Sequence, residues 1–208
     1  MNNKSGNRLP PDINVSRETE ARIATYVDLL TKWNATINLV SKTSISEVWE
    51  RHIVDSLQIF NFGSNAAHWA DLGSGGGLPG LVVAILASEK APNMLVTLVE
   101  SDQRKAAFLR HAGQALSVKT QVVTDRIEAV LPLGADVISA RALAPLPQLC
   151  GFAARHLAPD GLAIFLKGKF AQSEVTEARK SWQFSLQSHT SITESSSSVL
   201  LLKGISRV

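Results

Sequence analysis

A glycine-rich segment, DLGSGGGLPG at residues 71–80, carries the residue types best suited to holding a ligand. It follows an apolar run that predicts a strand over residues 68–72, and a predicted helix begins near Leu78. Because glycine has no side chain, Gly73 and Gly75 let bare backbone amides approach a flat or anionic group. Asp71 ends the strand, where its carboxylate can turn toward the same pocket. The segment therefore predicts a site for a nucleoside cofactor.

A second candidate ligand group, Glu100, ends the next apolar run, MLVTLVE. At the tip of the second strand of a parallel sheet, a carboxylate can accept hydrogen bonds from both hydroxyls of a ribose. That position serves NAD and S-adenosylmethionine equally. The glycine spacing from Gly73 is GxGxG, with the next glycine displaced to Gly80, so the strict GxGxxG of a dinucleotide site is absent. The spacing makes NAD the weaker of the two interpretations.

Two further stretches follow later predicted strands. Asp125, Arg126, Ile127 and Glu128 come after the third, where an adenine would lie against an apolar residue and a backbone amide. At the end of the fourth, ISARALAPL places the reacting centre opposite residues 139–141. Arg141 is a permanently charged planar group that can clamp a methionine carboxylate, a target base or an RNA phosphate. The residues leave these roles open, together with a structural pairing of Arg141 to Asp71 or Asp136.

The elements that must position these residues alternate along the chain. Apolar runs predict strands over residues 68–72, 95–100, 118–123, 136–140 and 162–167, with helices that begin near residues 78, 102, 126 and 145. A helix over residues 173–182 and two β-like runs, 183–192 and 197–205, predict a terminal hairpin. The fold class is therefore α/β, with a seven-stranded doubly wound sheet like that of Rossmann-like class I methyltransferases.

Residues 16–62 precede this pattern and predict an N-terminal helical extension. Ile23, Val27 and Leu30 share one helix face, and Ser44 with Glu47 forms a capping box that opens a second helix. Residues 1–15 are polar and predict a flexible lead-in. We expect residues 63–208 to form the methyltransferase domain, in one compact unit with the extension.

Composition limits the location of the protein. Of its 208 residues, 45% are hydrophobic, yet no uncharged apolar run approaches the length of a membrane span. The first residues lack the apolar core of an export signal. One cysteine, Cys150, cannot form an internal disulfide and predicts a buried thiol on an apolar helix face. We expect a cytoplasmic protein that uses neither a membrane nor a metal.

The residues missing from the fourth strand bear on the reaction. The Asn-Pro-Pro-Tyr or Asp-Pro-Pro-Tyr element used to methylate exocyclic amines is absent there, and Cys150 is poorly placed as a nucleophile for pyrimidine carbon 5. Guanine N7 carries an in-plane lone pair that is free at neutral pH. Its methylation needs alignment and no general base. A site without an obvious base therefore favours N7.

Seven motifs occur together: WNATINLV, RHIVDSL, DLGSGGGLPG, LVESDQRKAAFL, DRIEAV, ISARALAPL and FLKGK. In this order and spacing they resemble the bacterial 16S ribosomal RNA guanine-N7 methyltransferases, the glucose-inhibited division protein B family, over nearly the whole chain. The resemblance implies S-adenosylmethionine bound at Gly73, Leu78, Ile127, Glu128 and Arg141. Glu100 joins this set by its position.

The substrate implied by the resemblance is one guanine in a loop of small-subunit ribosomal RNA near the decoding site, within a ribosomal particle. We expect RNA contacts from basic residues at the pocket rim: Arg51, His52, Arg126, Lys167 and Lys169. His52 has the alternative of a hydrogen bond to Asp55 or to a loop carbonyl, and the two lysines that of a solvated strand end. The modest net charge of +3 indicates that specificity comes largely from the assembled particle.

Two other functions remain open from the residues. An NAD-linked oxidoreductase would share the glycine segment and Glu100 but needs a proton-relaying residue, and the only tyrosine, Tyr26, lies in the helical extension. A non-catalytic RNA-binding or ribosome assembly factor would keep the cofactor pocket as a structural feature.

Overall fold

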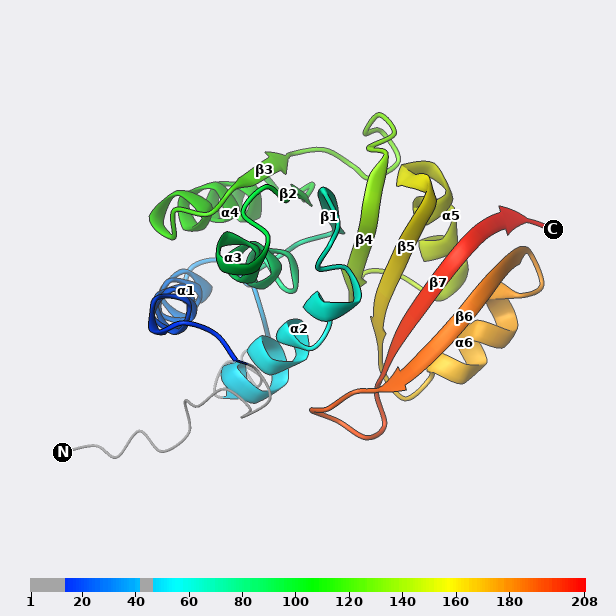
Figure 1. The fold of residues 1–208 in the computed structure, drawn as a ribbon, viewed down its shortest axis with the longest axis horizontal. Helices are drawn as coiled ribbons and strands as arrows, with labels where there is room; N and C mark the ends of the chain where they lie inside the picture. The colour runs from blue at the N-terminus through cyan, green and yellow to red at the C-terminus, as the bar shows by residue number, and fades with distance from the viewer. Residues whose placement is uncertain (1–13, 42–46) are drawn as a thin grey trace.

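The computed structural model describes residues 14–41 and 47–208 and contains one seven-stranded sheet in the order β3-β2-β1-β4-β5-β7-β6 (Figure 1). The strands are β1 (His68–Leu72), β2 (Leu95–Val99), β3 (Thr120–Val123), β4 (Ala135–Arg141), β5 (Leu157–Lys167), β6 (Trp182–Thr190) and β7 (Ser198–Arg207). The first five are parallel, and β7 runs antiparallel to both β5 and β6. The predicted fold class and terminal hairpin are confirmed.

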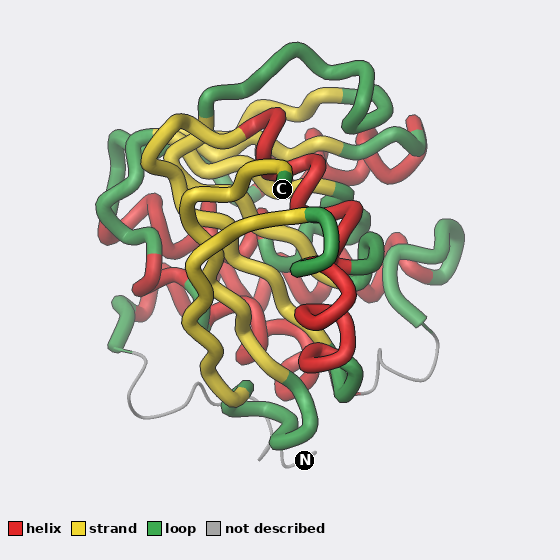
Figure 2. The backbone as a smooth tube through the Cα atoms, turned by 90° about the vertical axis from the view of Figure 1, so that its right-hand side faces the viewer, coloured by secondary structure: helices red, strands yellow, loops and turns green. Residues whose placement is uncertain are grey.

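Helices cover both faces of the sheet, as Figures 1 and 2 show. One face packs against α3 (Gly80–Lys90) and α4 (Gln103–Ala115), with α1 (Arg17–Asn34) lying over these two helices, and the other against α5 (Leu146–His156) and α6 (Ala171–Ala178). Successive residues of β1 alternate between the two cores, since Trp69 packs on the first side and Ala70 on the second. Parallel strands buried on both sides explain why their sequences read as continuous apolar runs.

Helix α3 shows how the extension is attached to the sheet. Its residues 80–87 are all buried because the sheet lies under one side and α1 packs over the other. Ser16 caps α1, and its hydroxyl also donates to Glu89 of α3 at 2.8 Å. The Thr19 hydroxyl donates to the same Glu89 carboxylate oxygen at 2.5 Å. The extension and the sheet thus share one hydrophobic core.

One local prediction was wrong, and another differs in detail. No helix forms at Arg126: the amides of Ala129 and Val130 both donate to its carbonyl, which makes a single turn before Pro132.

The second helix of the extension is a π-helix, η2 (Trp49–Val54), that continues into the short α2 (Asp55–Leu57) and the 3-10 turn η3 (Phe60–Phe62). Ser44 of the predicted capping box and residues 1–13 of the lead-in lie outside the described residues.

Cys150 is fully buried on α5, as predicted, and burial raises the pKa of its thiol to about 12. Along residues 14–41 and 47–208, no helix combines the length and apolar character needed to cross a membrane.

Candidate cofactor and substrate site

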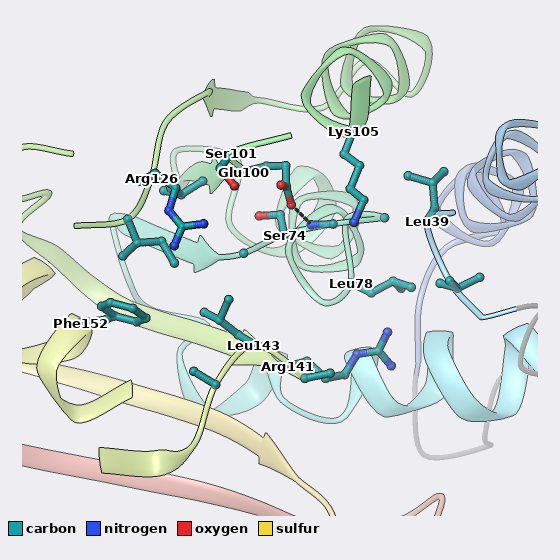
Figure 3. A pocket seen from close by; sticks show the side chains of 18 of the residues that line it. Leu39, Ser74, Leu78, Glu100, Ser101, Lys105, Arg126, Arg141, Leu143 and Phe152 are labelled. Carbon is teal, nitrogen blue, oxygen red and sulfur yellow. Dashed lines mark hydrogen bonds between the residues drawn. The ribbon is translucent and has the colours of Figure 1, made fainter. Parts of the chain in front are cut away.

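A pocket of about 680 Å³ opens at the carboxyl ends of β1, β2 and β4 (Figure 3). This is where open α/β sheets bind ligands, because the crossovers leave a crevice there. The sequence-predicted residues that line it are Gly73, Gly75, Leu78, Glu100, Arg126, Ile127, Glu128, Arg141 and His52. The fold therefore brings most of the predicted site into one cavity.

The glycine loop between β1 and α3 adopts a backbone that other residues rarely reach. Gly73 has φ +67° and Gly75 has φ +54°. A Cβ atom at Gly73 would lie 2.5 Å from Cδ1 of Leu143, which lines the same pocket. The Ser74 amide donates to the Val99 carbonyl at 3.0 Å, which ties the loop to the end of β2. A side chain at position 73 would disturb both the backbone and the pocket wall.

Glu100 follows β2 and is 8% exposed. Its Oε2 accepts the Gly75 amide at 2.8 Å (Figure 3). Its Oε1 accepts the Asp102 amide at 2.8 Å. These bonds fix the carboxylate against the glycine loop. Each carboxylate oxygen has a second lone pair, so both oxygens can still accept a ligand hydroxyl.

Asp71 does not line the pocket. Its carboxylate is buried beneath the loop, where Oδ1 accepts the Ser139 hydroxyl at 2.7 Å and Oδ2 accepts the Gly80 amide at 3.2 Å. Burial raises the pKa of Asp71 to about 6, although these hydrogen bonds oppose the shift. The strand-end carboxylate is directed at the start of α3 and at β4, so it supports the loop from behind.

Tyr26 of α1 supports the same loop from the opposite side. Its hydroxyl donates to the Gly76 carbonyl at 2.6 Å, and burial raises the pKa of Tyr26. This role of Tyr26 was not predicted from the sequence. A signal was present, because Tyr26 lies on the apolar face with Ile23 and Leu30, where a polar-tipped aromatic needs a partner.

The pocket wall beside Ile127 is apolar. Ile127 and Phe152, which projects from α5, both line it. The Ile127 carbonyl lies 3.0 Å from Nε2 of His156, which is fully buried. Burial lowers the pKa of His156, so the neutral ring donates this hydrogen bond. Phe152 and His156 were not predicted as site residues, since only the packing of α5 against the turn after β3 brings them there.

Arg141, the last residue of β4, lies across the pocket from Glu100 (Figure 3). Its Nη1 is 2.8 Å from His52 Nδ1 and 3.7 Å from Asp55 Oδ2. Burial, followed by the charge of Arg141, lowers the pKa of His52 to about 4, so the neutral imidazole accepts this hydrogen bond. The partner of His52 is therefore Arg141. Arg141 itself pairs with Asp55, and neither Asp71 nor Asp136 takes that place.

Asp55 connects three distant segments. While its Oδ2 faces Arg141, its Oδ1 accepts Gln58 Nε2 at 2.6 Å and the hydroxyls of Ser191 and Thr193, each at 3.1 Å. Helix α2, the end of β4 and the loop between β6 and β7 meet at this carboxylate. No local motif in the sequence signals such a junction.

The family model for rRNA small subunit methyltransferase G (GidB) matches residues 19–201. A "Ribosomal RNA small subunit methyltransferase G" from Ruegeria sp. is 50% identical over 95% of this chain and 96% of the relative. A protein of the same name from Paramagnetospirillum magneticum is 47% identical over 93% of this chain and 92% of the relative. The chain belongs to this family. The resemblance inferred from the motifs is confirmed.

Solved structures similar to this member of the GidB family show the same fold. A mutant of MtNAS in complex with S-adenosylmethionine gives a TM-score of 0.57 at 16% identity, over 89% of this chain and 75% of that one. An O-methyltransferase from Bacillus cereus in complex with SAH gives 0.58 at 14% identity, over 92% and 94%.

The basic residues predicted for RNA differ in exposure. Arg51 and Arg126 are exposed and lie near Glu47 and Glu128, at 3.3 and 3.8 Å. Lys169 is exposed, with Nζ 5.0 Å from the centre of the Phe170 ring. Lys167 differs from these three. Its side chain is 11% exposed, and Nζ lies 2.6 Å from Glu174 Oε2.

Lys105 also lines the pocket and was not predicted. It lies in the first turn of α4, and its side chain extends toward the glycine loop (Figure 3). This leaves a cation within reach of an anionic ligand on the side of the pocket opposite Arg141.

Proposed function

We propose that this protein transfers the methyl group of S-adenosylmethionine to N7 of one guanine in small-subunit ribosomal RNA. The observation that carries the proposal is the pocket in which the glycine loop and Glu100 face Arg141, in a chain of this family. The relatives' name states the RNA and the class of reaction. The choice of N7 is supported by chemistry, because methylation there needs no base and the end of β4 presents Arg141, a positioning group, to the pocket.

The residues of the pocket fit the cofactor part by part. Gly73 and Gly75 would present backbone to the methionine part, and Leu78 would pack beside it. Glu100 would accept the ribose hydroxyls, and the adenine would lie between Ile127 and Phe152, next to Glu128. Arg141 would face the methionine carboxylate or the incoming nucleotide. We infer this assignment from the positive φ of the glycines, the fixed Glu100 carboxylate and the apolar wall.

When bound, S-adenosylmethionine would supply the methyl group, which the N7 lone pair would accept as the bond to sulfur breaks, and the positive charge would pass to guanine. No proton leaves N7, so the protein needs to align the base and exclude water. His52 suits that role because its Nδ1 is held by Arg141 and its pKa of about 4 leaves it uncharged at neutral pH.

We propose the exposed cations Arg51, Arg126 and Lys169 as RNA contacts, together with His52, which lines the pocket. Lys167 is largely buried and is not part of this exposed group. We infer that the substrate is a ribosomal particle, because three scattered cations supply little affinity for naked RNA. We also infer a cytoplasmic location, where ribosomal subunits are made. Residues 16–62 act in one unit with residues 63–208, since Tyr26 supports the cofactor loop.

The proposal is tested with small ribosomal subunits from cells that lack this enzyme. With methyl-labelled S-adenosylmethionine, we expect label in the small-subunit RNA and a single cleavage by chemistry specific for N7-methylguanosine. No incorporation into any RNA, with the protein still bound to the particle, would identify a non-catalytic assembly factor. Calorimetry that shows NADH bound and S-adenosylhomocysteine ignored would identify an oxidoreductase.

A further inference from the structure

A second, smaller cavity of about 250 Å³ adjoins the cofactor pocket, and Arg141 and Ala142 belong to the walls of both. It lies beyond the ends of β4 and β5, between α6 and the chain that joins β6 to β7. Polar and charged side chains form much of its wall: Asp55, Lys167, Glu174, Ser191, Ser197 and Ser198. A cavity beside the methyl donor is where the acceptor base has to enter.

Lys167 and Glu174 form the most constrained pair in this cavity. Lys167 Nζ lies 2.6 Å from Glu174 Oε2 and donates to the Ala144 carbonyl at 3.0 Å. The same Oε2 accepts the Leu146 amide at 2.7 Å. The two side chains are 11% and 25% exposed, and they project from a strand end and a helix, so the pair is held in place before any ligand arrives.

The pair keeps unused hydrogen-bonding capacity. An ammonium has three donors, and the contacts to Glu174 and Ala144 use two of them. Among the described residues, no hydrogen bond reaches Oε1 of Glu174, although a carboxylate oxygen accepts up to two. A free donor and a free acceptor therefore lie side by side in the cavity.

We propose that this cavity holds the target guanine and that Glu174 and Lys167 recognise its Watson–Crick edge. This inference rests on the proposed function. Guanine offers two donors there, N1–H and the 2-amino group, next to the acceptor O6. Oε1 of Glu174 accepts from the two donors, and Lys167 donates to O6. Adenine has an acceptor at N1 and a donor at N6, so the same pair rejects it.

The orientation suits the reaction. O6 lies between the Watson–Crick edge and N7, so a guanine bound through O6 to Lys167 turns its N7 edge away from Glu174. That edge then faces the wall of Arg141 and Ala142 that the cavity shares with the cofactor pocket. When one extruded base is recognised in a pocket, the protein does not need an extended surface that contacts many bases.

The pair also acts on the rate. Methylation at N7 places positive charge on the ring, and this charge makes N1–H a stronger hydrogen-bond donor. The bond to the Glu174 carboxylate is therefore stronger in the transition state than in the bound substrate, which raises kcat as well as affinity.

Inosine in place of the target guanine tests the contact without changing the protein. Inosine lacks the 2-amino group and keeps N1–H, O6 and N7. Small subunits are reconstituted with 16S RNA ligated from a synthetic fragment that carries guanine or inosine at the methylated position. For the wild-type enzyme we expect kcat/KM to be about tenfold lower with inosine. Equal rates on the two particles would overturn the inference.

Glu174→Gln completes the comparison. The amide keeps an oxygen for Leu146 but presents N–H groups to the guanine donors, so we expect kcat/KM on guanine to fall about 10- to 100-fold, with a drop in kcat. The variant should no longer distinguish inosine from guanine. If it discriminates as the wild type does, Glu174 does not touch the 2-amino group.

Glu177→Gln is the matched control, because Glu177 lies on the same helix, pairs with Lys180 at 2.6 Å and is 60% exposed. It should leave both rates unchanged, while calorimetry with S-adenosylhomocysteine should give wild-type affinity for both variants. Failure of the proposed function has a separate signature: the wild-type enzyme would not methylate guanine particles at all.

Discussion

The two sides of the cofactor pocket are built in different ways. On one side, residues 71–80 and Glu100 belong to a single βαβ unit, and backbone amides do most of the holding. On the other, Arg141 depends on His52 and Asp55 from the extension, and Asp55 depends on Ser191 from the far end of the sheet. The first side is encoded locally, and the second exists only after the whole chain has folded.

The difference has an energetic side as well. Backbone amides in a glycine loop need no partner residue to be charged or in a given rotamer. The Arg141 side holds a guanidinium and a carboxylate that are 16% and 15% exposed. If Arg141 is removed, Asp55 loses its ion pair but keeps the hydrogen bonds from Gln58, Ser191 and Thr193. We therefore expect a substitution in the glycine loop to abolish activity by blocking the cofactor. A substitution on the Arg141 side should leave the pocket open but remove the group that positions the cofactor and the base.

Gly73→Asp should have the largest effect. Its Cβ would meet Leu143 at 2.5 Å with φ at +67°, and its carboxylate would occupy the cofactor pocket. We expect binding of S-adenosylhomocysteine, measured by calorimetry, to weaken about 100-fold or more. Gly134→Asp is the control, because it has φ +58° with no atom within 4 Å of an added Cβ. It carries similar backbone strain outside the pocket and should bind normally. Wild-type affinity in Gly73→Asp would refute the cofactor assignment.

Arg141→Ala should have the next largest effect and should separate turnover from stability. We expect methyl transfer to ribosomal particles to fall about 100-fold, because the group between cofactor and base is lost. The melting temperature should fall by only a few degrees, about the effect of 1–2 kcal/mol in a chain of this size. Arg22→Ala, which removes an arginine paired with Glu18 at 2.7 Å, should leave turnover unchanged. A large loss of stability with normal turnover would make Arg141 structural.

Acidification should have the smallest effect of the three changes. It should lower the free energy of unfolding by protonating His52 on the Arg141 side. The pKa of His52 is about 4 in the folded protein against 6.5 for a free imidazole, so the unfolded chain binds more protons between these values. Stability then falls as the pH drops from 6.5 toward 4, by about 1–2 kcal/mol for a partly exposed group. His52→Gln keeps an acceptor for Arg141 and should lose less between pH 7 and pH 4.5 in urea unfolding. Equal losses would show that His52 does not titrate as described.

Asp71 changes the stability with pH in the opposite direction to His52, so the two contributions must be measured separately. Its pKa of about 6 lies above the ordinary value of 3.8, so its contribution to stability is lost as the pH rises through that range. Because Asp71 is present in both proteins, the difference between the wild type and His52→Gln isolates His52.

The sequence predicted the parts of the molecule that depend on neighbours along the chain. Strand β1 was predicted with its observed bounds, His68–Leu72, and the glycine loop and Glu100 line the pocket as expected. The helix expected near Arg126 does not form, since Pro132 and Gly134 follow within two turns. Asp71 satisfied the sequence pattern of a ligand-facing strand end, yet its carboxylate bonds to Ser139, which only the pairing of β1 with β4 brings there.

The residues missed by sequence analysis are those that act across the fold. Tyr26 reaches Gly76, fifty positions away, and Asp55 reaches Thr193 across 138. His156 reaches Ile127 through the packing of α5. Asp55 and His156 are ordinary helical residues when judged by their neighbours in the sequence, whereas Tyr26 carries a signal as a polar-tipped aromatic on an apolar face. Their roles follow from crossovers and strand order, which local periodicity does not encode.

The position of β7 in the sheet has a consequence for synthesis of the chain. β7 is made after the other six strands of this sheet, yet it fills the place between β5 and β6. Until Ser198 and the residues after it have emerged, the edge of β5 carries unpaired backbone groups beside apolar side chains such as Phe165. A ribosome that stalls before this point would release a polypeptide whose β5 edge is unpaired and can pair with strands of other chains. We therefore expect incomplete products to aggregate or to be bound by chaperones.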